Sequence, residues 1–321
     1  GLPYCEQPQM DFFPEWGFDG SSTSQSSGDN SDLLLKPVYC VTDPLRGKGN
    51  YCLLCEVYDA QGQPHLSNTR APLRQLYTKV REQHDPWVGF EQEYTLFEGT
   101  SPLGWPVGGF PPPQGPFYCG VGAKKVHGRD MVEMHTKVCL AAGLMVFGTN
   151  AEVMPSQWEF QVGYRGFPEE VADPLTVSDH LWLSRWFLFR IGEEYGIEPS
   201  FANKPIKGDW NGAGNHTNFS TTAMREPNSG KGAIEQAIQQ LAKTHTEHIA
   251  VYGAGLEERL TGLHETCNLN EFKSGTADRS ASIRVPLRVA QKGYGYLEDR
   301  RPGANADPYR VCTRLIETIC L

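Results

Sequence analysis

The stretch Gly89-Phe-Glu-Gln-Glu-Tyr-Thr-Leu-Phe97 sets two carboxylates, Glu91 and Glu93, two residues apart within a run of aromatic and β-branched residues. That composition is typical of a β-strand, in which successive side chains alternate between two faces. Glu91 and Glu93 therefore share one face, about 7 Å apart at the rise of a strand, while Phe90 and Tyr94 share the other. Two acids this close repel each other unless positive charge lies beside them, and a pair of divalent cations is the usual solution.

A second strand of the same kind spans residues 150–163 and carries Glu152 and Glu159 between apolar residues. Trp158 and Phe160 face one side of this strand, which leaves Glu159 on the opposite side. For a single pair of acids, ordinary surface charge is the alternative interpretation. Four acids on two half-buried strands favour a bound cation, because a buried carboxylate is costly unless it has a partner.

The 321 residues, with 39% hydrophobic residues, 34 Gly and 23 Pro, indicate a loop-rich globular α/β or α+β protein rather than a disordered chain. Length predicts roughly two domains. We place a small β-rich domain at residues 1–70, whose abrupt start leads us to expect an incomplete N-terminus, and a larger domain at residues 71–321. The net charge of −9 disfavours nucleic acid as a partner.

Nine scattered cysteines, an odd number, favour a reducing compartment, and we expect a cytoplasmic location. The longest apolar stretch, residues 138–147, is too short to cross a bilayer, so we expect no membrane contact. Cys52 and Cys55 have the C-x-x-C spacing of redox and metal sites. They lie in a strand-like run rather than before a helix, which makes a functional thiol the less favoured reading.

Helical periodicity and capping signals predict five helices. Ser178 is the expected N-cap of the second long helix and Asp307 that of the last, where Pro308 takes the first helical position. The expected helices span residues 73–83, 129–142, 179–195 and 233–252, followed by one that begins at 308.

Two further segments of the larger domain have predicted positions. Three aromatic side chains of the helix at 179–195, namely Trp182, Trp186 and Phe189, are interpreted as core. The segment 104–122 is too rich in Gly and Pro to form a helix or strand, and we expect an ordered loop near the acidic strands.

Two more segments carry candidate ligands. His216 lies in a glycine-rich strand entry at 211–220, although a lone histidine is often structural. Near the end of the chain, Tyr296, Glu298 and Arg300 share one strand face, and a salt-bridged surface pair is the simpler interpretation of the last two. Five carboxylates and one histidine form an oxygen-rich ligand set suited to Mg²⁺ or Mn²⁺. Such ions beside arginines indicate phosphoryl transfer.

These motifs occur in order along essentially the whole chain, and together they resemble glutamine synthetase of the eukaryotic-type class II. The resemblance implies an α+β protein with a small N-terminal β-grasp domain at residues 1–70, whose first strands are missing from the sequence. It implies in addition a larger catalytic, ATP-binding domain at residues 71–321, whose curved, mainly antiparallel sheet is backed by helices. It also implies a homo-oligomer, usually a decamer of two pentameric rings. The segments that carry it are residues 18–23, 89–94, 150–163, 209–220, 259–265, 279–284 and 298–302.

The activity that the resemblance implies is nitrogen assimilation through ATP-dependent ligation of ammonium to L-glutamate. The products are L-glutamine, ADP and phosphate, and γ-glutamyl phosphate is the intermediate. Two or more Mg²⁺ or Mn²⁺ ions per site are implied as cofactors, with ATP as a substrate. Glu93, Glu152 and Glu159 would hold one ion, and Glu91, His216 and Glu298 the second.

The resemblance also assigns the remaining site residues. The catalytic residues would be Asp19, Glu265 and Arg279, with Asp19 supplied by a neighbouring subunit. Glutamate would bind at Trp210, Asn211, Gly212, Arg259, Arg279 and Arg300. The ATP site would comprise Glu91, Glu159, Asn218, Phe219, Ser220, Arg279, Arg284 and Tyr296.

One segment departs from the family pattern, because residues 164–177 form a longer segment that we expect to be a surface excursion. Two alternative functions remain open. A related ligase would join glutamate to a larger amine, although Asp19 favours ammonium. A non-catalytic structural relative, like the lens proteins of this superfamily, would be expected to have lost ligands that this chain retains.

Overall fold

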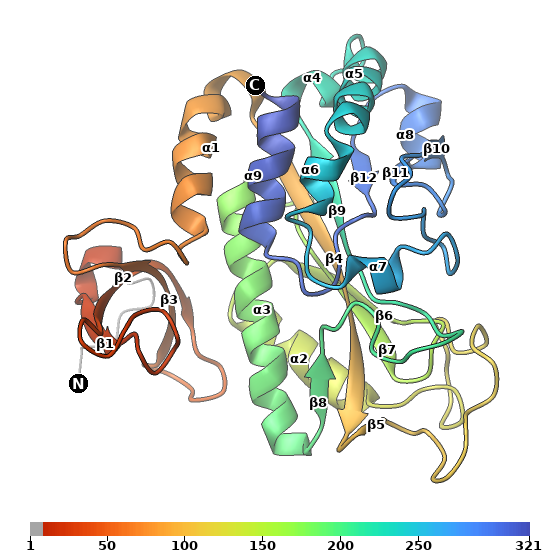
Figure 1. The fold of residues 1–321 in the computed structure, drawn as a ribbon, viewed down its shortest axis with the longest axis horizontal. Helices are drawn as coiled ribbons and strands as arrows, with labels where there is room; N and C mark the ends of the chain where they lie inside the picture. Colours follow the sequence, from red (N-terminus) through yellow and green to blue (C-terminus); the bar gives the residue numbers. More distant parts are fainter. Residues whose placement is uncertain (1–8) are drawn as a thin grey trace.

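The computed structural model describes residues 9–321 and contains two β-sheets (Figure 1). The first eight residues of the predicted N-terminal domain lie outside the described residues. The small sheet has the strand order β1-β2-β3 and is antiparallel throughout. It follows a short 3₁₀ helix at Met10–Phe12, and its strands are β1 (Trp16–Asp19), β2 (Asp32–Thr42) and β3 (Tyr51–Tyr58).

The large sheet runs in the order β10-β11-β12-β9-β4-β7-β6, and β5 and β8 also pair with β4. Its described strand pairs are antiparallel except for β10 with β11, which confirms the predicted α+β class and the mainly antiparallel sheet. The strands are β4 (Trp87–Glu98), β5 (Ser101–Pro102), β6 (Val146–Ala151), β7 (Gln157–Val162), β8 (Glu198–Ser200), β9 (Asn215–Ser220), β10 (Ser274–Thr276), β11 (Ile283–Val285) and β12 (Leu297–Asp299).

Helices α1, α3 and α9 stand between the small sheet and the strands of the large sheet (Figure 1). No helix within residues 9–321 has the length and apolar character that crossing a membrane requires. The helices are α1 (Arg70–His84), α2 (Arg129–Ala141), α3 (Pro174–Tyr195), α4 (Thr222–Arg225), α5 (Gly230–Lys243), α6 (His245–Ile249), α7 (Leu256–Arg259), α8 (Leu287–Lys292) and α9 (Pro308–Ile319).

The central strand β4 shows the alternation of faces that the sequence predicts. Phe90, Tyr94 and Leu96 are buried in the hydrophobic core on the side that faces the helices. Gln92 shares that side and is also buried, but its side-chain oxygen accepts a 2.8 Å hydrogen bond from Arg185 of α3. The core face of β4 therefore includes the polar pair of Gln92 and Arg185, and Glu91 and Glu93 lie on the opposite face.

The third helix starts earlier than expected. The structure begins α3 at Pro174, with Asp173 as the N-cap whose carboxylate accepts the backbone N–H groups of Leu175 and Thr176. Ser178, the expected cap, is buried within the helix. An Asp-Pro pair is the same signal that correctly located α9, and at this helix it was overlooked. The predicted excursion at 164–177 is therefore shorter, because its last four residues belong to α3.

The single helix expected at 233–252 is divided into α5 and α6. The break lies at Thr244, whose hydroxyl donates a 3.1 Å hydrogen bond to the carbonyl of Gln240. A threonine that bonds back in this way bends helices, which accounts for the break.

The aromatic residues of α3 that were interpreted as core are instead partly exposed in this chain. Trp182, Trp186 and Phe189 retain 37%, 40% and 45% of their accessible surface. They lie on the side of α3 opposite the buried Leu181, Phe187 and Ile191 face or at its margin, because α3 is apolar around most of its circumference.

The cysteines within residues 9–321 show no sign of a disulfide or a reactive thiol. Every cysteine that the structure describes is a free thiol. Cys52 and Cys55 lie in β3, where burial raises the pKa of Cys52 to about 12 and also raises the pKa of Cys55. Both thiols therefore stay protonated near neutral pH, and the C-x-x-C spacing marks a strand rather than a reactive pair.

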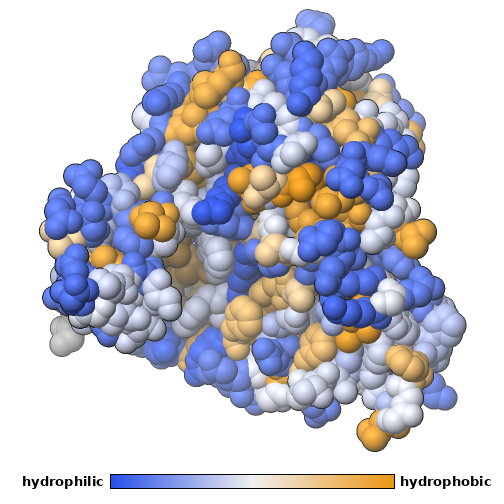
Figure 2. Space-filling model, viewed as in Figure 1, coloured by the Kyte–Doolittle hydropathy of each residue, from blue (hydrophilic) through white to orange (hydrophobic). Residues whose placement is uncertain are grey.

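A buried ionic group connects the small sheet to the helices, and in the space-filling view the small sheet forms a lobe set off from the rest by a hollow (Figure 2). Glu56 of β3 accepts hydrogen bonds from Arg70 at 2.9 Å and from Arg74 at 3.0 Å, both in α1. Arg70 also donates to Asp179 of α3 at 2.8 Å. Burial alone would raise the pKa of Glu56, but the bonds from Arg74, Tyr58 and Arg70 lower it to about 2.

We expect Glu56→Gln to lower the free energy of unfolding at pH 7 by roughly 3 kcal/mol, because it breaks a buried ion pair. A lowered carboxyl pKa stabilises the fold above the unfolded-state value near 4.3, and that stabilisation is lost as pH falls toward about 2. The difference in the free energy of unfolding between wild type and Glu56→Gln should therefore become smaller below about pH 4. Denaturant unfolding at pH 7 and pH 3 measures this difference. Glu15→Gln, which removes an exposed pair with Lys36, is the control and should cost less than about 1 kcal/mol.

Candidate active site

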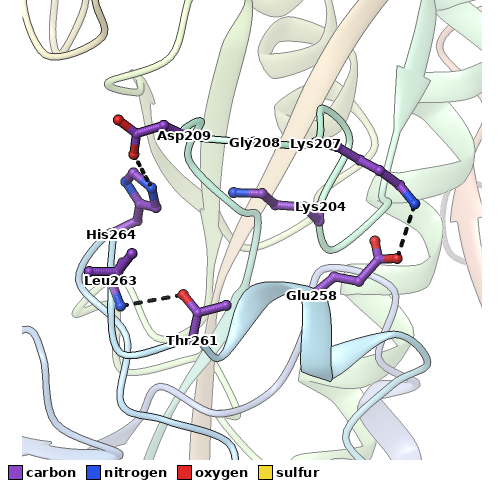
Figure 3. Close-up of a pocket in the computed structure, with 8 residues that line it drawn as sticks. All are labelled: Lys204, Lys207, Gly208, Asp209, Glu258, Thr261, Leu263 and His264. Carbon is purple, nitrogen blue, oxygen red and sulfur yellow. Dashed lines mark hydrogen bonds and ion pairs between the residues drawn. The ribbon is translucent and has the colours of Figure 1, made fainter.

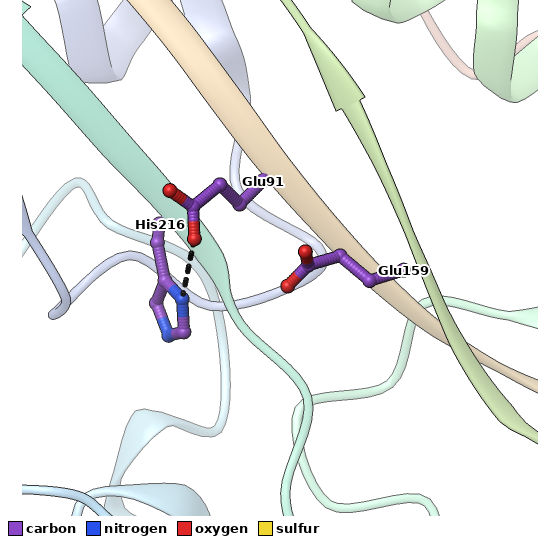
Figure 4. A group of neighbouring side chains, drawn as sticks. All are labelled: Glu91, Glu159 and His216. Atoms are coloured by element: carbon purple, nitrogen blue, oxygen red, sulfur yellow. Dashed lines mark ion pairs between the residues drawn. The ribbon is translucent and has the colours of Figure 1, made fainter. Parts of the chain in front are cut away.

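Strands β4, β7 and β9 are neighbours in the large sheet and bring the predicted metal ligands onto one face. The register sets Glu93 opposite Glu159 and Glu91 opposite His216. Figure 4 shows the side chains of Glu91, Glu159 and His216 pointing toward one another from these three strands. Residues that are up to 125 positions apart along the chain, from Glu91 to His216, thus meet in space.

Two groups of three side chains could each hold a metal ion. One comprises Glu93, Glu152 and Glu159, and the other Glu91, Glu159 and His216, with ligand atoms in each group within 4.8 Å of one another. Glu159 belongs to both groups. Glu93, Glu152 and Glu159 are 6–9% exposed, so the interpretation of these acids as surface charge is wrong.

The electrostatics of the first group fit a divalent cation. Burial, followed by the charges of neighbouring acids, raises the pKa of Glu152 to about 8 and that of Glu159 to about 9. Burial also raises the pKa of Glu93. Raised pKa values mean that the three carboxylates resist being ionised together at neutral pH unless a cation lies beside them. Their oxygen atoms are the ligands that Mg²⁺ and Mn²⁺ prefer.

His216 is held in the neutral form that binds metals. Burial, assisted by the charge of Arg300, lowers its pKa well below the usual value. The guanidinium of Arg259 lies 3.1 Å from Nε2 of His216. The other ring nitrogen, Nδ1, lies 3.7 Å from carboxylate oxygens of both Glu91 and Glu298.

Glu298 of β12 differs from the other predicted ligands because two arginines hold its carboxylate. Arg284 donates to it at 2.5 Å and Arg300 at 2.6 Å. Glu298 is only 1% exposed, so the alternative of a surface salt bridge is wrong. The predicted second trio of Glu91, His216 and Glu298 is therefore brought together, with its third carboxylate paired to arginine.

The segment at Asn211–Gly212 is fixed by contacts from β7 and α7. The side chain of Gln157 accepts from the Asn211 amide at 3.1 Å and donates to the Gly212 carbonyl at 2.8 Å. A Cβ atom at Gly212 would lie 2.9 Å from both the Arg259 side chain and the Asn203 carbonyl oxygen, so only glycine fits there. The predicted residue Trp210 packs its ring against Trp105, with the ring centroids 4.8 Å apart.

The predicted nucleotide contacts lie toward the other end of β9. The Asn218 amide donates to Glu91 at 2.8 Å, and the Ser220 hydroxyl accepts from Arg225 at 3.0 Å. Phe219 has its side chain in the hydrophobic core, and its backbone lies in the sheet between Val88 of β4 and Leu297 of β12. Tyr296 is 41% exposed, and burial together with the charge of Glu91 raises its pKa.

The three predicted catalytic residues lie at different places. Glu265 is exposed on a loop, and its backbone oxygen lies 3.4 Å from the Arg300 guanidinium. Arg279 is also exposed, and its backbone oxygen accepts from Arg300 at 3.0 Å. Asp19 lies in β1, beyond α1, α3 and α9 from the acidic strands, so this chain does not bring Asp19 to its own cluster (Figure 1).

Asp19 is nevertheless in a well-defined state. Its carboxylate accepts hydrogen bonds from the Ser21 and Ser22 hydroxyls, each at 2.6 Å. These bonds, that from Ser21 first, lower the pKa of Asp19 to about 2. The side chain therefore presents a fixed negative charge to solvent.

A cavity of about 580 Å³ lies between the loop at 204–209 and the loop that follows α7 (Figure 3). It adjoins the candidate site without containing any of the six predicted metal ligands. His264, which precedes Glu265, lines the cavity, and its Nε2 lies 3.0 Å from a carboxylate oxygen of Asp209. The lining residues are Lys204, Lys207, Gly208, Asp209, Glu258, Thr261, Leu263 and His264.

The structure adds residues that the sequence analysis missed. The alternation of β7 could have identified Gln157, since it shares a face with Glu159. Arg225 stacks over Trp87 at 4.3 Å, and Trp87 pairs with Ser220 across the sheet, which makes an aromatic platform beside the nucleotide contacts. Gln114, in the Gly- and Pro-rich loop, contacts Asn211, which confirms the predicted position of that loop near the site.

Two family models cover nearly the whole chain. The β-grasp domain of glutamine synthetase matches residues 6–60, and the catalytic domain of glutamine synthetase matches residues 67–320. The first match identifies the small sheet as the predicted β-grasp domain.

Similar curated proteins come from algae, fungi and bacteria. The chloroplastic glutamine synthetase of Chlamydomonas reinhardtii is 55% identical over 96% of this chain and 80% of its own length. Glutamine synthetase of Agaricus bisporus is 53% identical over 95% of this chain and 84% of its own length, and that of Streptomyces viridochromogenes is 52% identical over 97% and 88%. With both domains matched and more than half of the residues identical, this chain belongs to the glutamine synthetase family.

Proposed function

We propose that the acids of β4 and β7 form the metal centre of an enzyme that joins ammonia to L-glutamate at the expense of ATP. The protein is a glutamine synthetase, and its products are L-glutamine, ADP and phosphate. The observation that supports this assignment of residues is the pair of three-residue groups that share Glu159. The activity belongs to glutamine biosynthesis, and we propose nitrogen assimilation as its role.

The ligand set divides between two divalent ions in this proposal. Glu93, Glu152 and Glu159 would hold one Mg²⁺ or Mn²⁺ ion, and Glu91, His216 and Glu298 the second. When bound, such ions offset the negative charge of the phosphates and of the transferring phosphoryl group. For Glu298 to become a ligand, its carboxylate must share or exchange its contacts with Arg284 and Arg300.

Glutamate is proposed to bind between the Asn211–Gly212 segment and the arginines. Arg300 and Arg259 are buried cations that could pair with the substrate carboxylates, while Gln157 keeps Asn211 and Gly212 in place. Trp210, stacked on Trp105, would close this end of the site.

ATP is proposed to bind beside β9, with its phosphates directed toward Glu91 and Glu159. Asn218, Ser220 and Tyr296 would contact the nucleotide through their side chains, and Phe219 would support this site from the core. Trp87 with Arg225 provides a flat surface on which a base could stack. Arg279 and Arg284 would offset charge on the transferring phosphoryl group.

The chemistry proceeds in two steps in this proposal. A γ-carboxylate oxygen of glutamate attacks the γ-phosphorus of ATP, ADP leaves, and γ-glutamyl phosphate forms. Asp19 attracts ammonium and helps to remove its proton, since its carboxylate is ionised across the physiological range. Ammonia then attacks the carbonyl carbon of the acyl phosphate, phosphate leaves, and Glu265 on its loop limits access of water to the intermediate.

The position of Asp19 leads us to propose that the site is completed by another copy of the chain. We expect a homo-oligomer, a decamer of two pentameric rings, in which the β-grasp domain of one subunit reaches the acids of its neighbour. We retain residue 70 as the proposed domain boundary. The free thiols favour a reducing compartment, and we propose the cytoplasm.

The function predicts release of phosphate from ATP that requires glutamate, ammonium and Mg²⁺ or Mn²⁺ together. A chelator should abolish both phosphate release and glutamine formation, and added Mg²⁺ or Mn²⁺ should restore them. Replacing ammonium by larger amines separates the alternatives: a ligase for such amines would work better with them, and a non-catalytic relative would release no phosphate. Full activity in metal-free buffer would refute the proposed metal centre.

We expect the two arginines to have separable roles. Arg279→Ala should lower kcat by roughly 10²–10³-fold with the fold intact, as loss of a donor to transition-state charge does. Arg284→Ala should instead raise the KM for ATP by roughly tenfold, as loss of a charge-assisted hydrogen bond does. Steady-state kinetics measure both. If both substitutions raised only the KM for glutamate, this division of roles would be wrong.

A further inference from the structure

Three loops meet beside the candidate glutamate site through one side chain, Gln114. Its Oε1 accepts the backbone N–H of Asn211 at 2.8 Å, and its Nε2 lies 3.1 Å from Nδ1 of His264. Nε2 of His264 then reaches a carboxylate oxygen of Asp209 at 3.0 Å. Gln114 belongs to the loop at 104–122, Asn211 to the segment before β9, and His264 to the loop that carries Glu265.

The direction of these bonds is fixed by the one donor that cannot change. The backbone N–H of Asn211 requires an oxygen from Gln114, so the amide nitrogen of Gln114 must face His264. Nδ1 of His264 therefore accepts, and Nε2 carries the proton that is donated to Asp209. The four groups form a single directed chain from Asn211 to Asp209.

The loop at the far end of this chain has an unfavourable backbone. His264 and Glu265 are consecutive residues with φ of +52° and +58°, a left-handed conformation that side chains other than glycine disfavour. Contacts must therefore hold these residues in place. The contact from Gln114 is the better candidate, because the side chain of Asp209 is 95% exposed and its hydrogen bond with His264 contributes little.

We propose that Gln114 and His264 are positioning residues that couple the glutamate-binding segment at Asn211 to the loop bearing Glu265. The inference rests on the proposed roles of Asn211 and Glu265. When Asn211 is fixed by substrate, Gln114 is fixed as well, and through His264 it holds Glu265 over the acyl phosphate. The cavity of about 580 Å³ is lined by His264 and Asp209, and in this proposal it is the route by which solvent would reach the intermediate once the contact is lost.

Loss of the contact between Gln114 and His264 has a defined chemical consequence. Water that reaches γ-glutamyl phosphate adds to the carbonyl carbon of the acyl phosphate, and phosphate leaves with the electron pair of the broken C–O bond. Glutamate is regenerated, the remaining proton passes to solvent, and ATP has been hydrolysed without glutamine formation. The ratio of phosphate released to glutamine formed, which is one for a fully coupled enzyme, therefore reports the contact.

The test compares two variants that break the contact from opposite sides with two that do not. Gln114→Met keeps the length of the side chain without hydrogen bonds, and His264→Gly removes the ring while accommodating the positive φ. His264→Asn keeps an acceptor and tolerates this φ, so it should rescue coupling. Leu263→Ala is the control, because Leu263 is 64% exposed on the same loop.

At saturating ammonium we expect the phosphate-to-glutamine ratio to rise to about 2 or more in Gln114→Met and His264→Gly, with KM for glutamate up by about two- to tenfold, the effect of one lost hydrogen bond. His264→Asn and Leu263→Ala should stay near one. A ratio of one in both contact-breaking variants would overturn the proposal. So would an equal rise in Leu263→Ala.

An activity-independent measurement separates failure of this inference from failure of the proposed function. Amide hydrogen exchange of His264→Gly should be faster at the Asn211 backbone N–H, which His264 does not touch, and exchange of Gln114→Met should be faster across 261–266. Wild-type protein that makes no glutamine would refute the function alone. Unchanged exchange at Asn211 in His264→Gly would refute the coupling whatever the activity.

Discussion

Glu159→Ala is expected to lower kcat/KM for glutamine synthesis by roughly 10³-fold, the effect of several kcal/mol of lost charge stabilisation. Glu159 is the one residue in both candidate metal groups, so its removal weakens both sites at once. Its position opposite Glu93 in the sheet means that no neighbouring acid can replace it without a shift of register. Steady-state assays with Mg²⁺ and with Mn²⁺ measure the loss.

Glu169→Ala is the matched control, because Glu169 is an exposed acid in the excursion before α3. It should retain wild-type activity, and an equal effect of the two substitutions would show that the assignment of strand faces is wrong.

Stability gives an independent check on the same residue. The pKa of Glu159 is about 9 in the folded state and near 4.3 in the unfolded state. Ionisation of this acid therefore lowers the free energy of unfolding as pH rises from about 4.3 to about 9. Without metal at pH 8, Glu159→Ala should therefore unfold at the same temperature as wild type or higher, which excludes misfolding as the cause of lost activity. A clearly lower unfolding temperature would indicate a structural role instead.

The second large effect is expected from mixing two inactive variants. Asp19→Ala and Glu159→Ala should each be inactive alone, because one lacks the ammonium-binding acid and the other the metal centre. A mixed oligomer contains interfaces where an intact Asp19 of one subunit meets an intact Glu159 of another. Activity should therefore reappear after co-expression of the two variants, or after dissociation and reassembly.

The mixing experiment depends on showing that mixed oligomers form. Two different affinity tags on the two variants allow copurification to establish this, and a mixture of wild type with Glu159→Ala provides the reference activity. Mixed oligomers that stay inactive would mean that Asp19 serves its own chain, contrary to its position beyond α1, α3 and α9.

The sequence predicted those parts of the site that depend on local geometry. Strand alternation placed Glu91 and Glu93 on one face, and it did so correctly because β4 is buried on the other face by Phe90 and Tyr94. The Asp307–Pro308 signal located α9 correctly because a helix cap is also a local feature, made by residues that are adjacent in sequence.

What the sequence did not predict depends on residues far apart in the chain. Gln114 meets His264 across 150 positions, and no local pattern in a loop encodes such a contact. Arg284 is visible in the sequence as a charge, but its pairing with Glu298 follows from the antiparallel register of β11 with β12. The aromatic residues of α3 were misplaced because an apolar helix does not indicate which side remains uncovered.

The most direct test of the metal centre is a count of Mn²⁺ ions bound per chain, by isothermal titration or by paramagnetic resonance, with no nucleotide present. The account predicts at least two ions on wild type and on Glu169→Ala, and loss of tight binding at both positions in Glu159→Ala, since Glu159 serves both groups. Unchanged Mn²⁺ stoichiometry and affinity in a folded Glu159→Ala protein would contradict it.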